Sequence, residues 1–190
     1  MPIGMTCTQG PRTLPAPADA TVPGPLPDVI SKGLAAVFCG INPGLKAAAT
    51  GHHFAGNGNR FWRVLHLAGF TPQLLRSEND SQLLAYGYGL TTAVGRPTAK
   101  ASELTSLEFL ESTAALRRKI ERYRPAYIAF LGKAAYAANS GQTQLAWGRQ
   151  AQTFGGSKVW LLPNPSGLNR SFSLDDLVRA YRDFRLRHRL

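Results

Sequence analysis

The sequence predicts an α/β fold, a sandwich built around a mainly parallel sheet, and three observations support this prediction. Short, continuous apolar runs recur along the chain and end in glycine or proline, as buried strands do. Segments with apolar residues at helical spacing lie between these runs. A pattern of strand, Gly-Gly-Ser turn and strand follows at 150–163. Because strands alternate with helices, we expect ligands to bind outside the carboxyl ends of the strands.

The first predicted elements lie between residues 34 and 95. "LAAVFCG" at 34–40 predicts a buried strand. "NRFWRVLHLAG" at 59–69 predicts a helix that begins at an asparagine and ends at a glycine. "SQLLAYG" at 81–87 predicts a short helix, and "YGLTTAVG" at 88–95 predicts a short strand followed by a loop.

A long helix is predicted over 105–123. Thr105 and Glu108 have the spacing of a capping box at its start, and Pro125 ends it. Its expected apolar face consists of Leu107, Leu110, Ala114, Ile120 and Tyr123.

The last predicted elements follow this helix closely. "AYIAFLG" at 126–132 predicts a buried strand, and an alanine-rich helix begins at Lys133. After the hairpin at 150–163, a final helix is predicted over 173–184, with Ser173 as its cap. Its apolar residues are spaced i, i+3, i+4, i+7 at Leu174, Leu177, Val178 and Tyr181.

The chain is predicted to hold one globular domain behind a tail. Residues 1–27 are rich in proline and alanine, which predicts a flexible tail, and lack the features of a signal peptide. Residues 28–190 are long enough for a single domain with a real core. The apolar runs are too short to cross a bilayer, so no membrane contact is expected.

The charge of the chain predicts a polyanionic partner. Twenty-two Lys and Arg residues against 11 Asp and Glu give a net charge of +11. Nucleic acid is the first expectation, and ribosomal or lipid surfaces are alternatives. The arginines cluster at 116–124 and 177–190, and part of this charge belongs to the solvated faces of helices.

Cysteine and histidine usage predicts neither a metal nor a cofactor. The two cysteines, Cys7 in the tail and Cys39 in a predicted strand, are expected to remain reduced thiols in a cytoplasmic protein. His52 and His53 are adjacent, so on extended backbone they would point in opposite directions. Their role is left open.

Three strand-end loops, 40–54, 91–98 and 163–170, are the candidates for chemistry. "GINPG" and "PNPSGLNR" each follow an apolar strand and contain Asn-Pro and then glycine, which shapes the backbone. Ordinary turn chemistry is the alternative interpretation. None of the three loops contains a carboxylate, so a carboxylate nucleophile or base is not expected there. Lys133, at a helix start after "LG", could hold a phosphate or could be an ordinary exposed lysine.

Four segments resemble a known family. "VFCGINPGLKAAATGHHFAGNGNRFWRVLHLAGF", "GLTTAVGRPT", "LGKAAY" and "LPNPSGLNR" are similar to the mismatch-specific uracil-DNA glycosylases. These form the bacterial branch of the uracil/thymine-DNA glycosylase family within the uracil-DNA glycosylase superfamily. The resemblance covers about residues 28–185 and implies a three-layer α/β/α sandwich with a short, mostly parallel central sheet. It implies also excision of uracil from duplex DNA, with U·G mismatches favoured, to leave an abasic site.

The resemblance also implies roles for individual residues. Asn42 is expected to be catalytic and to position the water that attacks the sugar. The implied base pocket comprises Gly40, Ile41, Pro43, Gly44, Phe54 and Asn164, with Phe54 stacking on the flipped base. Leu168 matches the wedge that enters the duplex, and the other expected DNA contacts are Ser166, Gly167, Asn169, Arg170, Lys133 and Arg60. Ala47, Thr92 and Ala93 are expected at the pocket mouth.

Some positions depart from the family pattern. Ala47 stands where a small hydroxyl residue can occur, Thr92 where a lysine can occur, and Gly95 where an acidic residue is common. Two alternatives to a glycosylase remain open: a non-catalytic module that binds DNA lesions, and a nucleoside hydrolase acting on small molecules. The expected partner is double-stranded DNA with uracil mismatches, bound by a monomer in a bacterial cytoplasm, close to the nucleoid.

Overall fold

A five-stranded sheet forms the centre of the computed structural model, which describes residues 24–142 and 144–188. Its strand order is β2-β1-β3-β5-β4. β1 (Ala36–Gly40), β2 (Tyr88–Thr92), β3 (Tyr127–Leu131) and β5 (Ser157–Leu162) are parallel, and β4 (Gly148–Phe154) pairs antiparallel with β5 as the predicted hairpin. Most of the predicted tail, with Cys7, lies outside the described residues.

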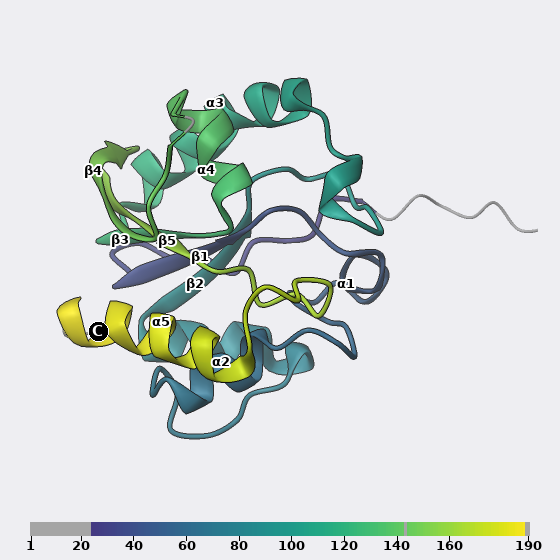
Figure 1. Ribbon diagram of the computed structural model, residues 1–190, viewed down its shortest axis with the longest axis vertical. Helices are drawn as coiled ribbons and strands as arrows, with labels where there is room; N and C mark the ends of the chain where they lie inside the picture. Colours follow the sequence, from purple (N-terminus) through teal and green to yellow (C-terminus); the bar gives the residue numbers. More distant parts are fainter. Residues whose placement is uncertain (1–23, 143, 189–190) are drawn as a thin grey trace, which may run out of the picture.

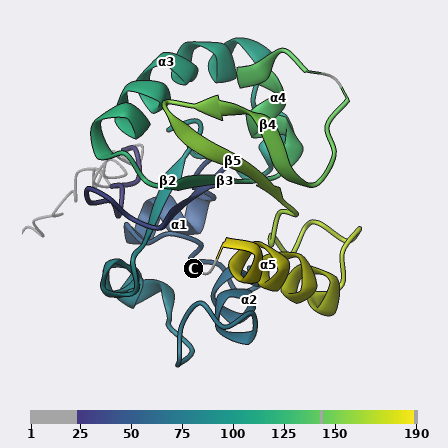
Figure 2. The ribbon, with the colours of Figure 1, turned by 90° about the vertical axis from the view of Figure 1, so that its left-hand side faces the viewer.

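Helices cover both faces of the sheet, which confirms the predicted α/β sandwich (Figures 1 and 2). α2 (Phe61–Leu67) and α5 (Leu174–His188) pack on one face, together with the 3₁₀ segment η1 (Ser77–Tyr86). α3 (Ser106–Tyr123) and α4 (Lys133–Ser140) pack on the other face.

The strands are apolar on both sides because both faces are covered. In β3, Tyr127, Ala129 and Leu131 belong to the core under α2 and α5, whereas Ile128 and Phe130 belong to the core under α3 and α4. This alternation follows from the two-residue period of a strand. It explains why the strands read as continuous apolar runs in the sequence.

The predicted apolar face of α3 is wrong in its first turns. Leu107 and Leu110 are 61% and 63% exposed, and the helix buries Phe109 and Leu116 instead, together with Ile120, which was predicted correctly. Phe109 and Leu116 form a set on a different side of the helix from Leu107 and Leu110, because each residue turns a helix by about 100°. Burial of the phenyl ring of Phe109 against α4 and the sheet decides which set faces inward.

Three short helical segments differ from the prediction. η1 begins at residue 77, earlier than the predicted helix at 81–87, and is kinked at Asn79. α1 (Leu45–Thr50) lies inside a segment predicted as loop, and η2 (Ala101–Glu103) follows the loop after β2. The predicted caps Thr105 and Ser173 are present, each accepting a backbone N–H three residues on.

Residues 24–29 form a strap along the edge strand β2. Val29 exchanges backbone hydrogen bonds with Leu90. Asp28 forms an ion pair with Lys119 at 2.6 Å and accepts a hydrogen bond from Thr91 at 2.6 Å. These contacts bring Leu26 and Pro27 to one side of the candidate site. In the described part of the chain, no helix is long and apolar enough to span a bilayer.

Candidate functional site

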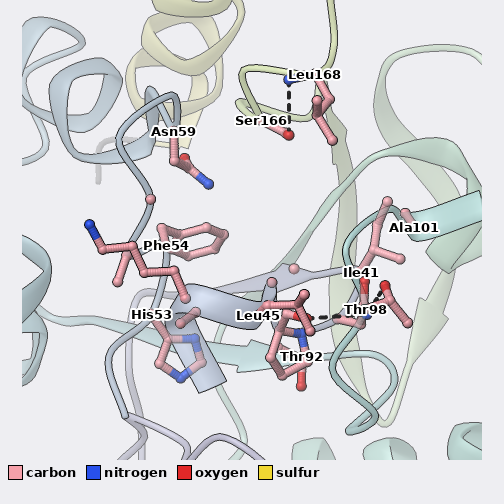
Figure 3. A pocket seen from close by; sticks show the side chains of 18 of the residues that line it. Ile41, Leu45, His53, Phe54, Asn59, Thr92, Thr98, Ala101, Ser166 and Leu168 are labelled. Atoms are coloured by element: carbon pink, nitrogen blue, oxygen red, sulfur yellow. Dashed lines mark hydrogen bonds between the residues drawn. The ribbon is translucent and has the colours of Figure 1, made fainter. Parts of the chain in front are cut away.

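A cavity of about 510 Å³ opens at the carboxyl ends of the parallel strands (Figure 3). β1 leads to β2 on one side and, later in the chain, β3 lies on the other, so the cavity occupies the point where the strand order reverses. The three predicted loops meet there. Of the predicted residues, the lining includes Gly40, Ile41, Asn42, Pro43, Gly44, Ala47, Phe54, Thr92, Asn164, Ser166, Gly167 and Leu168.

The side-chain amide of Asn42 has a fixed orientation. Its Nδ2 donates to the carbonyl oxygen of Arg96 at 2.8 Å and to Oγ1 of Thr98 at 2.7 Å. A carbonyl oxygen can only accept, so the nitrogen must lie on this side of the amide. No described residue donates a hydrogen bond to Oδ1 of Asn42. This oxygen is therefore the acceptor that the amide offers to a ligand or a water molecule.

Phe54 presents an aromatic ring to the cavity (Figure 3). The ring stacks on Phe61 with centroids 3.9 Å apart and an interplanar angle of 24°. Its edge lies 3.5 Å from the position that a Cβ of Gly40 would occupy, so the ring packs closely over the end of β1. The backbone of Phe54 is left-handed, with a φ of 56°.

The loop after β5 is held by its own asparagines. The backbone N–H of Ser166 donates to Oδ1 of Asn164, and Nδ2 of Asn169 donates to the carbonyl oxygen of Asn164. Leu168 is 69% exposed at the tip of this loop and lies at the cavity wall (Figure 3). An exposed apolar side chain on a loop fixed at its base can enter a partner at small entropic cost.

Arg60 supports this loop from below. Its guanidinium donates to the carbonyl oxygens of Phe172 at 2.7 Å, Asn169 at 2.8 Å and Ser166 at 3.0 Å. Nε also donates to Pro165 at 3.3 Å. With these donors used inside the protein, the geometry favours a positioning role for Arg60 over the predicted contact with DNA.

Gly58 and Gly167 bring the loop before α2 and the loop after β5 into close contact. A Cβ on Gly167 would lie 2.4 Å from the carbonyl oxygen of Gly58. Only glycine permits this approach of one backbone to another. Gly167 therefore sets the distance between the loop after β5 and the loop that leads to α2.

The other predicted DNA contacts lie outside the cavity. The ammonium group of Lys133, at the start of α4, lies 4.7 Å from the ring centroid of Trp147. Arg170 is exposed on the loop after β5.

Ala93, which was predicted at the pocket mouth, is buried in the core under α3 and does not line the cavity. Its neighbour Thr92 does line the cavity, because successive residues of a strand end face opposite sides.

His53 is a buried residue that lines the cavity. Its Nε2 lies 2.9 Å from the carbonyl oxygen of Pro27 and must carry the proton, since a carbonyl only accepts. Burial lowers the pKa of His53 and outweighs the opposite effects of the Pro27 hydrogen bond and of Asp80. A neutral ring whose Nε2–H is already used is a poor general base at that atom.

The cavity lining contains no carboxylate among the described residues. Lys46 and His53 are its titratable side chains, and Lys46 donates to Oδ1 of Asn57 at 2.8 Å. No group of three or more His, Cys, Asp or Glu residues that could hold a metal ion occurs in the described ranges. The chemistry of the site therefore rests on an amide, hydroxyls, an aromatic ring and backbone.

Several lining residues were not predicted. Leu26 comes from the strap, Thr98 and Ala101 from the segment after β2, and Asn59 from the loop before α2. One hint of Thr98 was present in the sequence, because the hydroxyl of a threonine in a predicted strand-end loop can accept a hydrogen bond from a neighbouring amide. Nothing in the sequence pointed to Leu26, because only the tertiary structure brings it into contact with Ala47.

Comparison with known proteins identifies the family to which the chain is similar. The model of the Uracil DNA glycosylase superfamily matches residues 27–185. The fold is similar to the solution NMR structure of a "putative Uracil DNA glycosylase" from Methanosarcina acetivorans. The two chains share 20% sequence identity with a TM-score of 0.54, and the match covers 85% of this chain and 97% of the archaeal one. At this identity the likeness concerns the fold.

Proposed function

This chain belongs to the uracil DNA glycosylase superfamily, and from this premise we propose that it removes uracil from DNA by hydrolysing the bond between the base and C1′ of the sugar. The observation that carries the proposal is the fixed amide of Asn42. Its Nδ2 is held by Arg96 and Thr98, so its Oδ1 can accept a hydrogen bond from a water molecule. Oriented in this way, the water would attack C1′ as the base departs.

The base would stack on Phe54. A nucleotide must leave the duplex to reach such a cavity, and this costs a few kcal/mol, least at a mismatch. Leu168, exposed beside the cavity, would fill the space that the base leaves. The volume of about 510 Å³ leaves room for a base and part of its sugar. We propose that U·G pairs are favoured because this wobble pair opens more easily than a Watson–Crick pair.

The departing uracil would carry negative charge, and the sugar would carry cation-like charge. Backbone N–H groups of the shaped loop after β1 would stabilise the uracil anion without a general acid. Asn42 cannot take up a proton at neutral pH, and the lining of described residues offers no carboxylate to do so. The proposed mechanism lacks a general base, which typically contributes about 10²–10⁴-fold. A slow, monofunctional glycosylase is the expected result.

A panel of single-turnover reactions tests the proposal. Labelled duplexes with U·G, U·A, T·G or no uracil, and single-stranded DNA with uracil, are incubated with excess protein and then cleaved by alkali at abasic sites. We expect U·G to react fastest and the uracil-free duplex to remain intact. Tight binding without any abasic product would instead indicate a lesion-binding module. Faster hydrolysis of free deoxyuridine than of DNA would indicate a nucleoside hydrolase.

A further inference from the structure

The left-handed backbone of Phe54 needs an explanation within the fold. Two non-glycine residues among those described have a positive φ, Phe54 at 56° and Arg124 at 48°. Arg124 ends α3, where a left-handed residue is common. Phe54 lies at no helix end, and a bulky side chain in this conformation persists only where its surroundings hold it.

His53, the residue before Phe54, is held at both of its backbone polar atoms. The N–H of His53 donates to Oδ2 of Asp80 at 3.0 Å, and its carbonyl oxygen accepts from Nε1 of Trp62 at 3.2 Å. The imidazole adds a third contact, to the carbonyl oxygen of Pro27. These partners come from η1, α2 and the strap, so three separate parts of the fold converge on one residue.

Asp80 is the one carboxylate among the buried polar residues of the described chain, and it is 6% exposed. A buried carboxylate is costly unless it accepts hydrogen bonds, so its position requires a compensating contact. The N–H of His53 provides this contact, and Nδ1 of His52 lies 3.5 Å from the same oxygen. Asp80 does not line the cavity, so it would not touch a bound base.

We propose that Asp80 is a positioning residue for Phe54. Its carboxylate fixes the backbone of His53, which keeps Phe54 left-handed and its ring stacked on Phe61 at 3.9 Å. The aromatic face is then already in place when a base arrives. This inference rests on the proposed function only in naming that base as uracil, because the backbone geometry exists without a ligand.

Nuclear magnetic resonance tests the structural half of this inference independently of activity. In the wild-type chain we expect nuclear Overhauser effects between the rings of Phe54 and Phe61. Asp80→Ala should abolish them while amide shifts of β1, β3 and α5 are retained, and Asp80→Asn, whose amide oxygen still accepts, should keep them. Asp176→Ala is the matched control, since Asp176 also accepts a backbone N–H at 3.0 Å, from Ser173, far from the cavity. Should Asp80→Ala be unstable, Asp80→Leu removes the acceptor while it keeps a side chain branched at Cγ.

A double-mutant cycle tests the functional half. Asp80→Ala should slow single-turnover excision from a U·G duplex about tenfold or more, as expected for loss of a charged hydrogen bond. In a Phe54→Ala background, the same change should slow it by less than about twofold, because no ring remains to be positioned. Equal losses in both backgrounds, or ring contacts that persist in Asp80→Ala, would overturn the inference. Ring contacts that vanish while excision is unchanged would uphold the positioning and would remove Phe54 from the proposed mechanism.

Discussion

At the scale of single residues, the chemistry of the cavity depends on which polar atoms are already hydrogen-bonded within the protein. Asn42 uses its nitrogen on Arg96 and Thr98 and keeps its oxygen for a ligand. His53 uses Nε2 on Pro27 and its backbone N–H on Asp80. The two side chains line the same cavity, but His53 is 1% exposed, whereas Asn42 is half-buried and its Oδ1 faces no described donor. This contrast is why we place the water at Asn42.

The buried imidazole of His53 predicts an acid-sensitive stability. Burial lowers its pKa below the ordinary 6.5, so at pH values under 6.5 the unfolded chain takes up the proton first. The contribution of His53 to the free energy of unfolding should therefore be complete above pH 6.5. It should be lost as the pH is lowered through the folded-state pKa. His53→Gln can still donate to Pro27 and does not titrate. In urea unfolding between pH 7.5 and 5, the free energy of unfolding should decrease less for His53→Gln than for the wild-type chain. If the two chains lose the same free energy over this range, His53 is not the cause of the acid sensitivity.

Residue types were more predictable from the sequence than residue roles. Asn42 and Phe54 could be singled out because the motif around them resembles a known family, and both line the cavity. The loop-supporting role of Arg60 could not be predicted, because Pro165, one of its carbonyl partners, lies 105 residues away. The contact of Asp80 with His53 was hidden for the same reason.

At the scale of elements, α3 reaches the site through its capping box. Glu108 accepts hydrogen bonds from the N–H of Thr105 at 2.8 Å and from the guanidinium of Arg96. The carbonyl oxygen of Arg96 in turn accepts from Asn42. The hydrogen bond from Arg96 holds the pKa of Glu108 at about 2, so this pairing persists at every ordinary assay pH. The start of α3 thus helps to orient the proposed catalytic amide.

Removal of the Glu108 carboxylate should affect excision more than folding. In Glu108→Ala the loop that carries Arg96 loses an anchor, and we expect single-turnover excision from a U·G duplex to fall several-fold, up to about tenfold. Asp176→Ala is the control, because Asp176 completes the same kind of cap with Ser173 on α5 and contacts no cavity residue. Similar rates for the two variants, measured beside their melting temperatures, would contradict the role given to Glu108.

The orientation of α3 shows what the sequence pattern alone cannot decide, namely which side of the helix faces the core. Its sequence contains two overlapping apolar stripes, one through Leu107 and Leu110 and one through Phe109 and Leu116. Periodicity cannot choose between them, whereas packing on the sheet does, and it buries the second. The strands could be predicted because burial on both faces makes each of them a continuous apolar run.

At the scale of the whole molecule, the sheet order explains why distant loops share one cavity. β2 lies beside β1, and only β3 separates β1 from β5, so the loops that follow β1, β2 and β5 meet although they are far apart in sequence. The basic charge of +11 favours a polyanionic partner. Part of it is used within the fold, however: Arg182 and Arg185 of α5 donate to the carbonyl oxygens of Leu67 and Ala68 at the end of α2. Charge alone therefore overestimates the surface available to DNA.

The central claim is that a water held by Asn42 attacks the sugar once the base has entered the cavity. The most direct test compares wild-type chain and Asn42→Ala on one U·G duplex, with single-turnover excision and duplex affinity measured in parallel. We predict that excision falls by at least about 10²-fold, while affinity changes by less than about tenfold, because the wedge and loops remain. Unchanged excision in Asn42→Ala would contradict the claim.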